Sequence, residues 1–169
     1  MIKNRFAIVT LTATALSLCL QGASALELAR HADAENKLVV EHAEVIMAPS
    51  GSMMLAGYLT VWNGSKQQAD LVSVQSDDFS SVSLHRTEVI DGVAKMRPIK
   101  EGVLIPGHAE LVMKPGGLHM MLMEPKTDLK AGDTVGLLLS FEDGTSTATT
   151  AIIRPIGTKP TDHHHGSVD

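Results

Sequence analysis

Residues 82–98 read VSLHRTEVIDGVAKMRP, with the dipeptide Asp91-Gly92 between two runs rich in β-forming residues. An Asp-Gly pair in this setting is the strongest local signal for a two-residue β-hairpin turn. On both sides of this hairpin, turn signals and short apolar or alternating runs recur at the spacing of an all-β sandwich or barrel. The clearest other turn signals are Asn63-Gly64, Pro115-Gly116-Gly117 and Asp143-Gly144. Strands are expected at 37–47, 56–63, 69–75, 82–90, 93–98, 109–114, 119–124, 134–141 and 146–154.

The N-terminus has the pattern of a secretory signal peptide. Lys3 and Arg5 precede an apolar run over 6–20, and small residues follow up to Ala25. The run is shorter than the roughly 20 residues that span a bilayer, which disfavours the alternative of a membrane anchor. Cys19 lies inside the run without the small residue that normally precedes a lipidated cysteine, which disfavours a lipoprotein. We therefore expect cleavage after Ala25 and export.

Length and composition predict one folded domain between two terminal segments. A chain of 169 residues is enough for a single domain. The expected divisions are a signal peptide at 1–25, an N-terminal extension at 26–36, a β-sandwich domain at 37–156 and a flexible, histidine-containing tail at 157–169.

The mature chain is acidic and lacks cysteine. Removing the signal peptide leaves 12 of the 14 basic residues and all 19 acidic residues, a net charge of −7. This charge disfavours nucleic acid and anionic membrane surfaces as partners. Because the only cysteine, Cys19, lies in the signal peptide, the mature protein has no disulfide scaffold, thiol redox chemistry or thiolate metal site.

Histidine and methionine side chains occur at spacings that place them on common faces. A two-residue turn in the 82–98 hairpin puts Met96 opposite Thr87 and diagonal to His85, on the same face. Residues 119–123 read HMMLM, so the period of two in a strand puts His119, Met121 and Met123 on one face. We expect the Pro-Gly-Gly turn upstream to bring this second strand to the end of the sandwich, where hairpin tips gather the ligands.

The chemistry of these side chains favours a soft metal ion. Imidazole and thioether ligands suit copper(I), whereas calcium and magnesium prefer oxygen ligands. A blue-copper electron carrier would need a cysteine ligand, which the mature chain lacks. His85, Met96, His119 and Met121 therefore predict a site that holds or transfers copper(I).

A purely structural role is the alternative for each of these residue types. Methionine often fills protein cores, and we expect Met47, Met113 and Met120 to pack there. Isolated histidines are usually surface or hydrogen-bonded residues, which is our expectation for His31, His42 and His108. Two rival functions stay open at this point. One is a protein-interaction domain with incidental methionines, and the other is a copper enzyme such as an oxidase or dismutase.

The same residues also resemble a known family. The order of His85, Met96, His119 and Met121, within VSLHRTEVIDGVAKMRPI and LVMKPGGLHMMLME, resembles the periplasmic copper chaperones that supply the copper-A centre of cytochrome c oxidase. The stretch AGYLTVWNGSKQQADLVSVQS is similar to the early strands of that family. The resemblance implies a cupredoxin-like Greek-key β-sandwich and a copper(I) site made of these four residues. One departure is that 22 residues separate Met96 from His119, one more than in the family pattern.

The tail adds a second candidate site. His163, His164 and His165 follow Asp162 and are similar to the histidine- or methionine-rich extensions implicated in copper(II) binding in that family. The alternative is a tag remnant or an inert polar tail. The resemblance implies a periplasmic copper chaperone that is not an enzyme and does not insert into the membrane after processing. Its expected partners are copper ions and an acceptor, either the copper-A subunit of cytochrome c oxidase or another copper chaperone.

Overall fold

The computed structural model describes residues 36–49 and 52–160, which form β-strands and connecting turns. The strands are β1 (Leu38–Ile46), β2 (Met54–Asn63), β3 (Ala69–Gln75), β4 (Phe79–Ile90), β5 (Val93–Pro98), β6 (Val103–Ile105), β7 (Ala109–Val112), β8 (Leu118–Pro125), β9 (Thr134–Phe141) and β10 (Ser146–Arg154). The all-β prediction is confirmed. Within the described ranges no helix is long and apolar enough to cross a membrane. The predicted signal peptide and the tail histidines lie outside the described residues.

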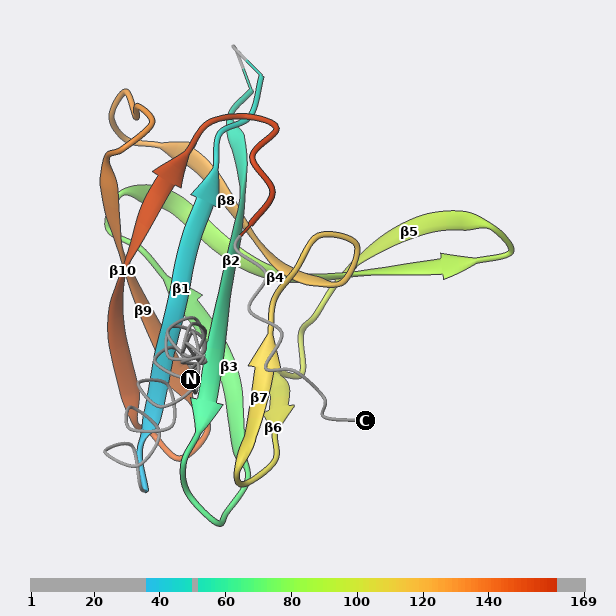
Figure 1. Ribbon diagram of the computed structural model, residues 1–169, viewed down its shortest axis with the longest axis vertical. Helices are drawn as coiled ribbons and strands as arrows, with labels where there is room; N and C mark the ends of the chain where they lie inside the picture. Colours follow the sequence, from blue (N-terminus) through green and yellow to red (C-terminus); the bar gives the residue numbers. More distant parts are fainter. Residues whose placement is uncertain (1–35, 50–51, 161–169) are drawn as a thin grey trace, which may run out of the picture. The chain divides into compact units, whose positions relative to one another are not determined.

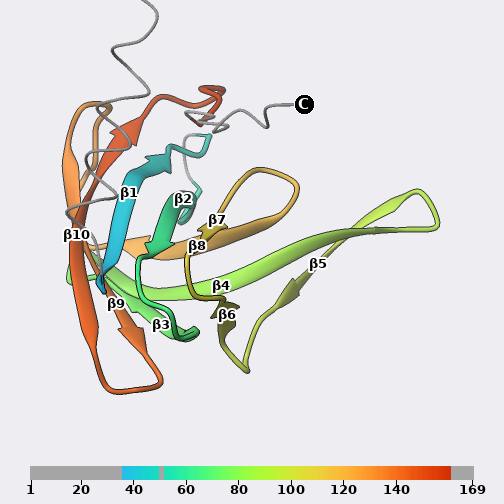
Figure 2. The same cartoon turned by 60° about the horizontal axis from the view of Figure 1, so that its bottom comes forward.

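The strands form a sheet that curls around one core (Figures 1 and 2). Its order is β5-β4-β8-β2-β1-β10-β9-β3-β6, and β7 pairs with β2 beside this path. The pairing of β1 with β10 is parallel, and the other pairings are antiparallel. Strand β8 lies between β4 and β2, so the chain returns to pair with β4 after β5, β6 and β7, as in the long connections of Greek-key folds.

Alternation along the strands divides core from surface. In β2 every second residue is buried, from Leu55 to Asn63. In β8 the side chains of Leu118, Met120 and Leu122 are buried, and they pack with residues of the other strands. The period of two therefore sends Met121 and Met123 to the outer face of the same sheet.

One buried polar side chain organises the end of β2. Asn63 is fully buried, and its amide group donates hydrogen bonds to the carbonyl oxygens of Gln67, Ile105 and Pro106 at 2.8, 3.1 and 3.2 Å. Its side-chain oxygen accepts from the backbone N–H and the hydroxyl of Ser65. Asn63 thus ties the turn after β2 to the end of β6.

The sequence-based strand assignment missed one element. Strand β6 has three residues and pairs antiparallel with β3. Three residues between Gly102 and Pro106 are too few to show an alternation of apolar and polar side chains. Their strand conformation depends on pairing with β3, which is distant in sequence.

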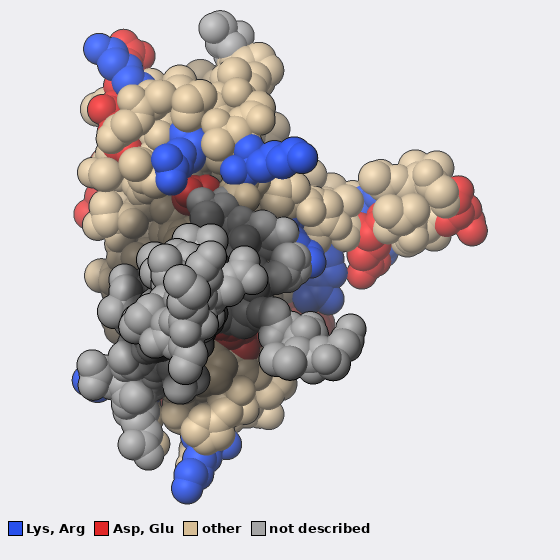
Figure 3. All heavy atoms as spheres, viewed as in Figure 1, with Lys and Arg blue, Asp and Glu red and all other residues tan. Residues whose placement is uncertain are grey.

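Strands β4 and β5 form a hairpin that projects from the rest of the domain (Figures 1 and 2). Asp91 and Gly92 have φ values of 53° and 75°, the two positive values of a type I′ turn. Every residue of β5 is exposed, and Val89 near the tip is 72% exposed. Figure 3 shows acidic side chains at the far end of the hairpin. We call this projection the β4–β5 arm.

Candidate metal centre

The register of the arm places Met96 where the sequence predicted it. Thr87 pairs with Met96, and His85 pairs with Pro98, two residues along. Directly paired residues point to the same face of a sheet, and so do residues two apart in one strand. Met96 and His85 are therefore diagonal neighbours on one face, which confirms the predicted register.

A second ladder brings β8 against the other side of β4. His85 pairs directly with His119, and Ser83 pairs with Met121. The same alternation argument puts His119 and Met121 on the face that carries His85 and Met96. All four predicted ligands therefore lie on the outer face of β5, β4 and β8, opposite the core residues of β8.

The two imidazoles are spaced for a shared ion. The ring centroids of His85 and His119 are 6.0 Å apart, and the rings are tilted by 33°. A metal–imidazole bond is about 2 Å long and a ring nitrogen lies about 1.2 Å from its centroid, so two rings on one ion have centroids at most about 6.4 Å apart. The observed spacing falls inside that limit.

The backbone fixes the tautomer of His119. Its Nδ1 lies 3.0 Å from the carbonyl oxygen of Gly117. A carbonyl oxygen only accepts, so Nδ1 carries the proton and donates, and Nε2 keeps a free lone pair. A second hydrogen bond of this kind orients metal-binding histidines in many proteins. The side chain is 5% exposed, so this orientation is also held by packing.

The ring of His85 has one unpaired nitrogen. Its Nε2 lies 3.0 Å from the hydroxyl oxygen of Ser83, whereas its Nδ1 is buried with no hydrogen-bond partner in the described part of the chain. Burial lowers the pKa of His85, and the charge of His119 lowers that pKa further. Both effects favour the neutral imidazole, which is the form that binds metal ions.

The two thioethers lie on opposite sides of His85. Met121 is half-buried and Met96 is 53% exposed. On a flat ladder, two strand spacings of about 4.8 Å and four residues at about 3.4 Å would separate their Cα atoms by about 17 Å. A methionine sulfur lies only roughly 4–5 Å from its Cα, so both can share an ion only if the arm twists and bends toward β8.

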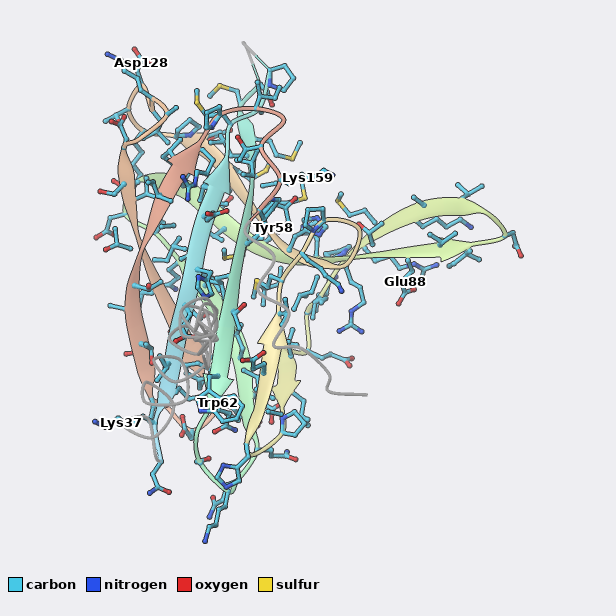
Figure 4. The ribbon with its side chains drawn as sticks, viewed as in Figure 1. Lys37, Tyr58, Trp62, Glu88, Asp128 and Lys159 are labelled. Carbon is cyan, nitrogen blue, oxygen red and sulfur yellow. The ribbon has the colours of Figure 1, made fainter. Side chains whose placement is uncertain are left out.

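The position of the cluster corrects one expectation. The sequence interpretation placed the ligands at hairpin tips at the end of the sandwich. His85, His119 and Met121 instead lie within β4 and β8, on the outer face at the base of the arm, because the β4–β8 ladder extends from Phe79 to Arg86. Met96 is the only one of the four in β5. Figure 4 shows sulfur atoms in the upper half of that view, and its Glu88 label marks the projecting part of the arm.

The remaining predictions for histidine and methionine also have outcomes. Met113 and Met120 are buried and Met47 packs against the core, as expected. His108 is exposed, as expected of an isolated surface histidine, and His42 is half-buried, while His31 lies outside the described residues.

The chemistry of the cluster is that of a neutral, soft-ligand site. Within 36–49 and 52–160, no three His, Cys, Asp or Glu side chains gather as metal ligands, so the described chain offers no carboxylate-rich or all-histidine alternative. Two imidazoles and two thioethers favour a soft monovalent ion and add no charge to offset it.

Comparison with known proteins identifies the fold. The sequence model of the family described as "Putative lipoprotein LpqE-like" matches residues 38–153. The copper-bound PCuAC domain from PmoF2 superposes with a TM-score of 0.58 and 24% identity, covering 72% of this chain and 96% of that one. The solution structure of CuI-DR1885 from Deinococcus radiodurans has a TM-score of 0.52 and 30% identity, covering 69% of this chain and 76% of that one. The domain thus has the PCuAC fold, which confirms the predicted cupredoxin-like Greek-key sandwich.

A sequence relative is similar over a shorter stretch. Uncharacterized protein RP573 of Rickettsia prowazekii (strain Madrid E) is 37% identical over 90 residues, which are 53% of this chain and 50% of that protein. The chain therefore matches about half the length of this relative.

Proposed function

The chain belongs to the LpqE-like family, and on that premise we propose that it is a copper chaperone that binds copper(I) through His85, Met96, His119 and Met121. The PCuAC fold supports this proposal, because the solved structures that share it include a copper-bound domain and a CuI-bound protein. In this proposal copper is cargo that the protein takes up and releases, and the protein is not an enzyme.

One observation carries the proposal. Two imidazoles from neighbouring strands face each other with centroids 6.0 Å apart, and a thioether lies diagonal to His85 on each side. Core packing does not require such a set on an outer face. Imidazole and thioether together prefer copper(I) over the harder and commoner divalent ions.

The ligand set also suits release. Neutral ligands leave the positive charge of the ion uncompensated, so they hold it less tightly than thiolates do. Met96 is exposed on the arm, where an acceptor can reach the ion first. We propose that copper(I) leaves by stepwise ligand exchange, in which an acceptor thiolate replaces Met96 before the histidines detach. No electron transfer is needed.

Further parts of the proposal concern location and partners. We propose that the protein is exported to the periplasm after cleavage behind Ala25, and that its acceptor is the copper-A subunit of cytochrome c oxidase or another copper chaperone. We also propose that His163, His164 and His165 bind copper(II) in the tail.

An anaerobic competition titration against a coloured copper(I) chelator tests the main site. We expect the unmodified protein to take up copper(I) tightly, and His85→Ala or His119→Ala to weaken binding by at least about tenfold, because even indirect supports of metal ligands are worth 10–100-fold. His108→Ala is the matched control, since His108 is exposed and lies outside the cluster. Equal affinities in all four proteins would refute the assignment and favour an interaction domain without a metal role.

A further inference from the structure

A second set of thioethers continues the outer face beyond the cluster. Met123 is two residues from Met121 in β8 and points to the same face. Met123 pairs directly with Met54 of β2, and on its other side with Ser81 of β4. The β2–β8 and β4–β8 ladders thus place three methionines next to one another on the outer face, in the order Met121, Met123 and Met54. The last of them, Met54, is exposed to solvent.

The spacing of this run permits shared ligation. Directly paired residues have Cβ atoms about 4.5–5.5 Å apart, and residues two apart in a strand are separated by about 6.8 Å. A methionine side chain has three rotatable bonds and a polarisable sulfur, so neighbours at these distances can turn their thioethers to one ion. Met54 and Met123 can meet on an ion, and Met121 can reach the same ion or the histidine cluster.

Packing does not explain these residues. The core side of β2 and β8 is filled by Leu55, Met120 and Leu122, which are buried. Met54 is 40% exposed on the opposite face, and the preceding Met53 is also exposed. Flexible, oxidisable side chains at a wet surface add little to stability, whereas thioethers in contact with solvent are suited to collecting a soft ion.

We propose that Met54 and Met123 form a second, weaker copper(I) site that adjoins the histidine cluster and exchanges copper with it through Met121. This inference rests on the proposed function for the direction of transfer. Copper enters at Met54 and Met123, Met121 joins as third ligand, and His119 and His85 then replace Met54 and Met123. Copper stays in the +1 state, only copper–sulfur and copper–nitrogen bonds form or break, and no proton or electron moves.

The test is NMR of the full mature chain with methionine methyl groups labelled with ¹³C. Copper(I) is added anaerobically, and silver(I) serves as a soft monovalent probe that air does not oxidise. The methyl signals are assigned with single Met→Leu variants, which keep side-chain volume. We expect the signals of Met96 and Met121 to shift with the first equivalent and those of Met54 and Met123 with the second. The signal of buried Met113 should stay fixed as an internal control.

The outcomes separate this inference from the proposed function. The second site is overturned if, at two equivalents, the signals of Met96 and Met121 have shifted and those of Met54 and Met123 have not. That result leaves the main site in place. Shifts of Met54 and Met123 alone support the second site and overturn the main one. In the His85→Ala/His119→Ala variant, we expect Met54 and Met123 to respond already to the first equivalent.

Transfer kinetics test the role in exchange. In M54L/M123L we expect the main site to keep its copper(I) affinity and to load several-fold more slowly from a chelator. M113L is the control, because Met113 lies in the core. Unchanged loading rates in M54L/M123L would overturn the proposed exchange route.

Discussion

His85 and His119 are direct partners across β4 and β8, and their ring centroids are 6.0 Å apart. Two imidazoles at this distance repel each other when both are protonated and cooperate when both are neutral and share an ion. The pair therefore links metal binding to pH, and the first prediction follows from that link.

We expect His85 to titrate below the ordinary histidine value of 6.5, because burial and then the charge of His119 lower its pKa. A lowered pKa means that the folded protein resists protonation more than the unfolded chain does. The stability contribution of neutral His85 is thus complete above about pH 6.5 and is lost as the pH falls below that value. An NMR titration of the metal-free protein measures the midpoint, and His119→Gln should raise it. A midpoint at or above 6.5 in the unmodified protein would contradict the expectation.

Metal binding should close the arm. Met96 and Met121 lie on opposite diagonals of His85, so a shared ion requires the arm to bend toward β8. We expect copper(I) to slow amide hydrogen exchange in β5, whose residues are all exposed, and to leave β9 unchanged. In Met96→Leu the ion no longer holds the arm, so β5 should exchange at its metal-free rate and affinity should fall by about tenfold. Slowed exchange in β5 of Met96→Leu would show that the arm closes without this ligand.

Local patterns predicted much of this fold because its turns are specified locally. Asp91 and Gly92 set a two-residue turn, and that turn alone fixes the pairing of Thr87 with Met96. The alternation in 119–123 likewise separates buried Met120 from Met121 on the outer face. Information of this kind is contained within a few residues, so a single sequence is enough to read it.

Pairings between distant strands were not predictable in this way. His85 and His119 are 34 residues apart, and no local pattern in either segment predicts that β4 pairs with β8 in that register. The expectation of hairpin tips failed for this reason, since the ligands meet along a ladder. Met54 was not singled out because its partner Met123 is in a strand that only the folded sheet brings beside it.

A change in the interior should separate stability from metal binding. Asn63→Ala leaves the carbonyl oxygens of Gln67, Ile105 and Pro106 without their donor. The hydrogen bond to Ile105 is buried, and the other two are partly buried. Unsatisfied buried groups cost about 1–3 kcal/mol each, so we expect the free energy of unfolding to fall by about 3 kcal/mol. Urea denaturation measures the loss. Copper(I) affinity at low temperature should be unchanged, because Asn63 lies in a different part of the sheet from the cluster.

Export should produce a defined N-terminus. We expect the mature protein isolated from the periplasm to begin at Leu26, since the small residues before it fit a signal-peptidase site. Intact mass spectrometry measures this directly. The family description names lipoproteins, so the competing result is a chain that begins at Cys19 with attached lipid. That result would place the domain at a membrane surface and would contradict cleavage after Ala25.

The tail should bind copper(II) independently of the main cluster. His163, His164 and His165 are adjacent in sequence, and imidazoles on a tail can gather around copper(II) without a preformed pocket. A chain that ends at Pro160 should lose copper(II) binding, measured by electron paramagnetic resonance, and keep its copper(I) affinity. Replacing the three histidines by alanine in the full chain is the matched control, because it keeps the tail length. If copper(II) binding survives both changes, the copper(II) site lies outside the tail. If copper(I) affinity falls, the tail and the main cluster share one ion.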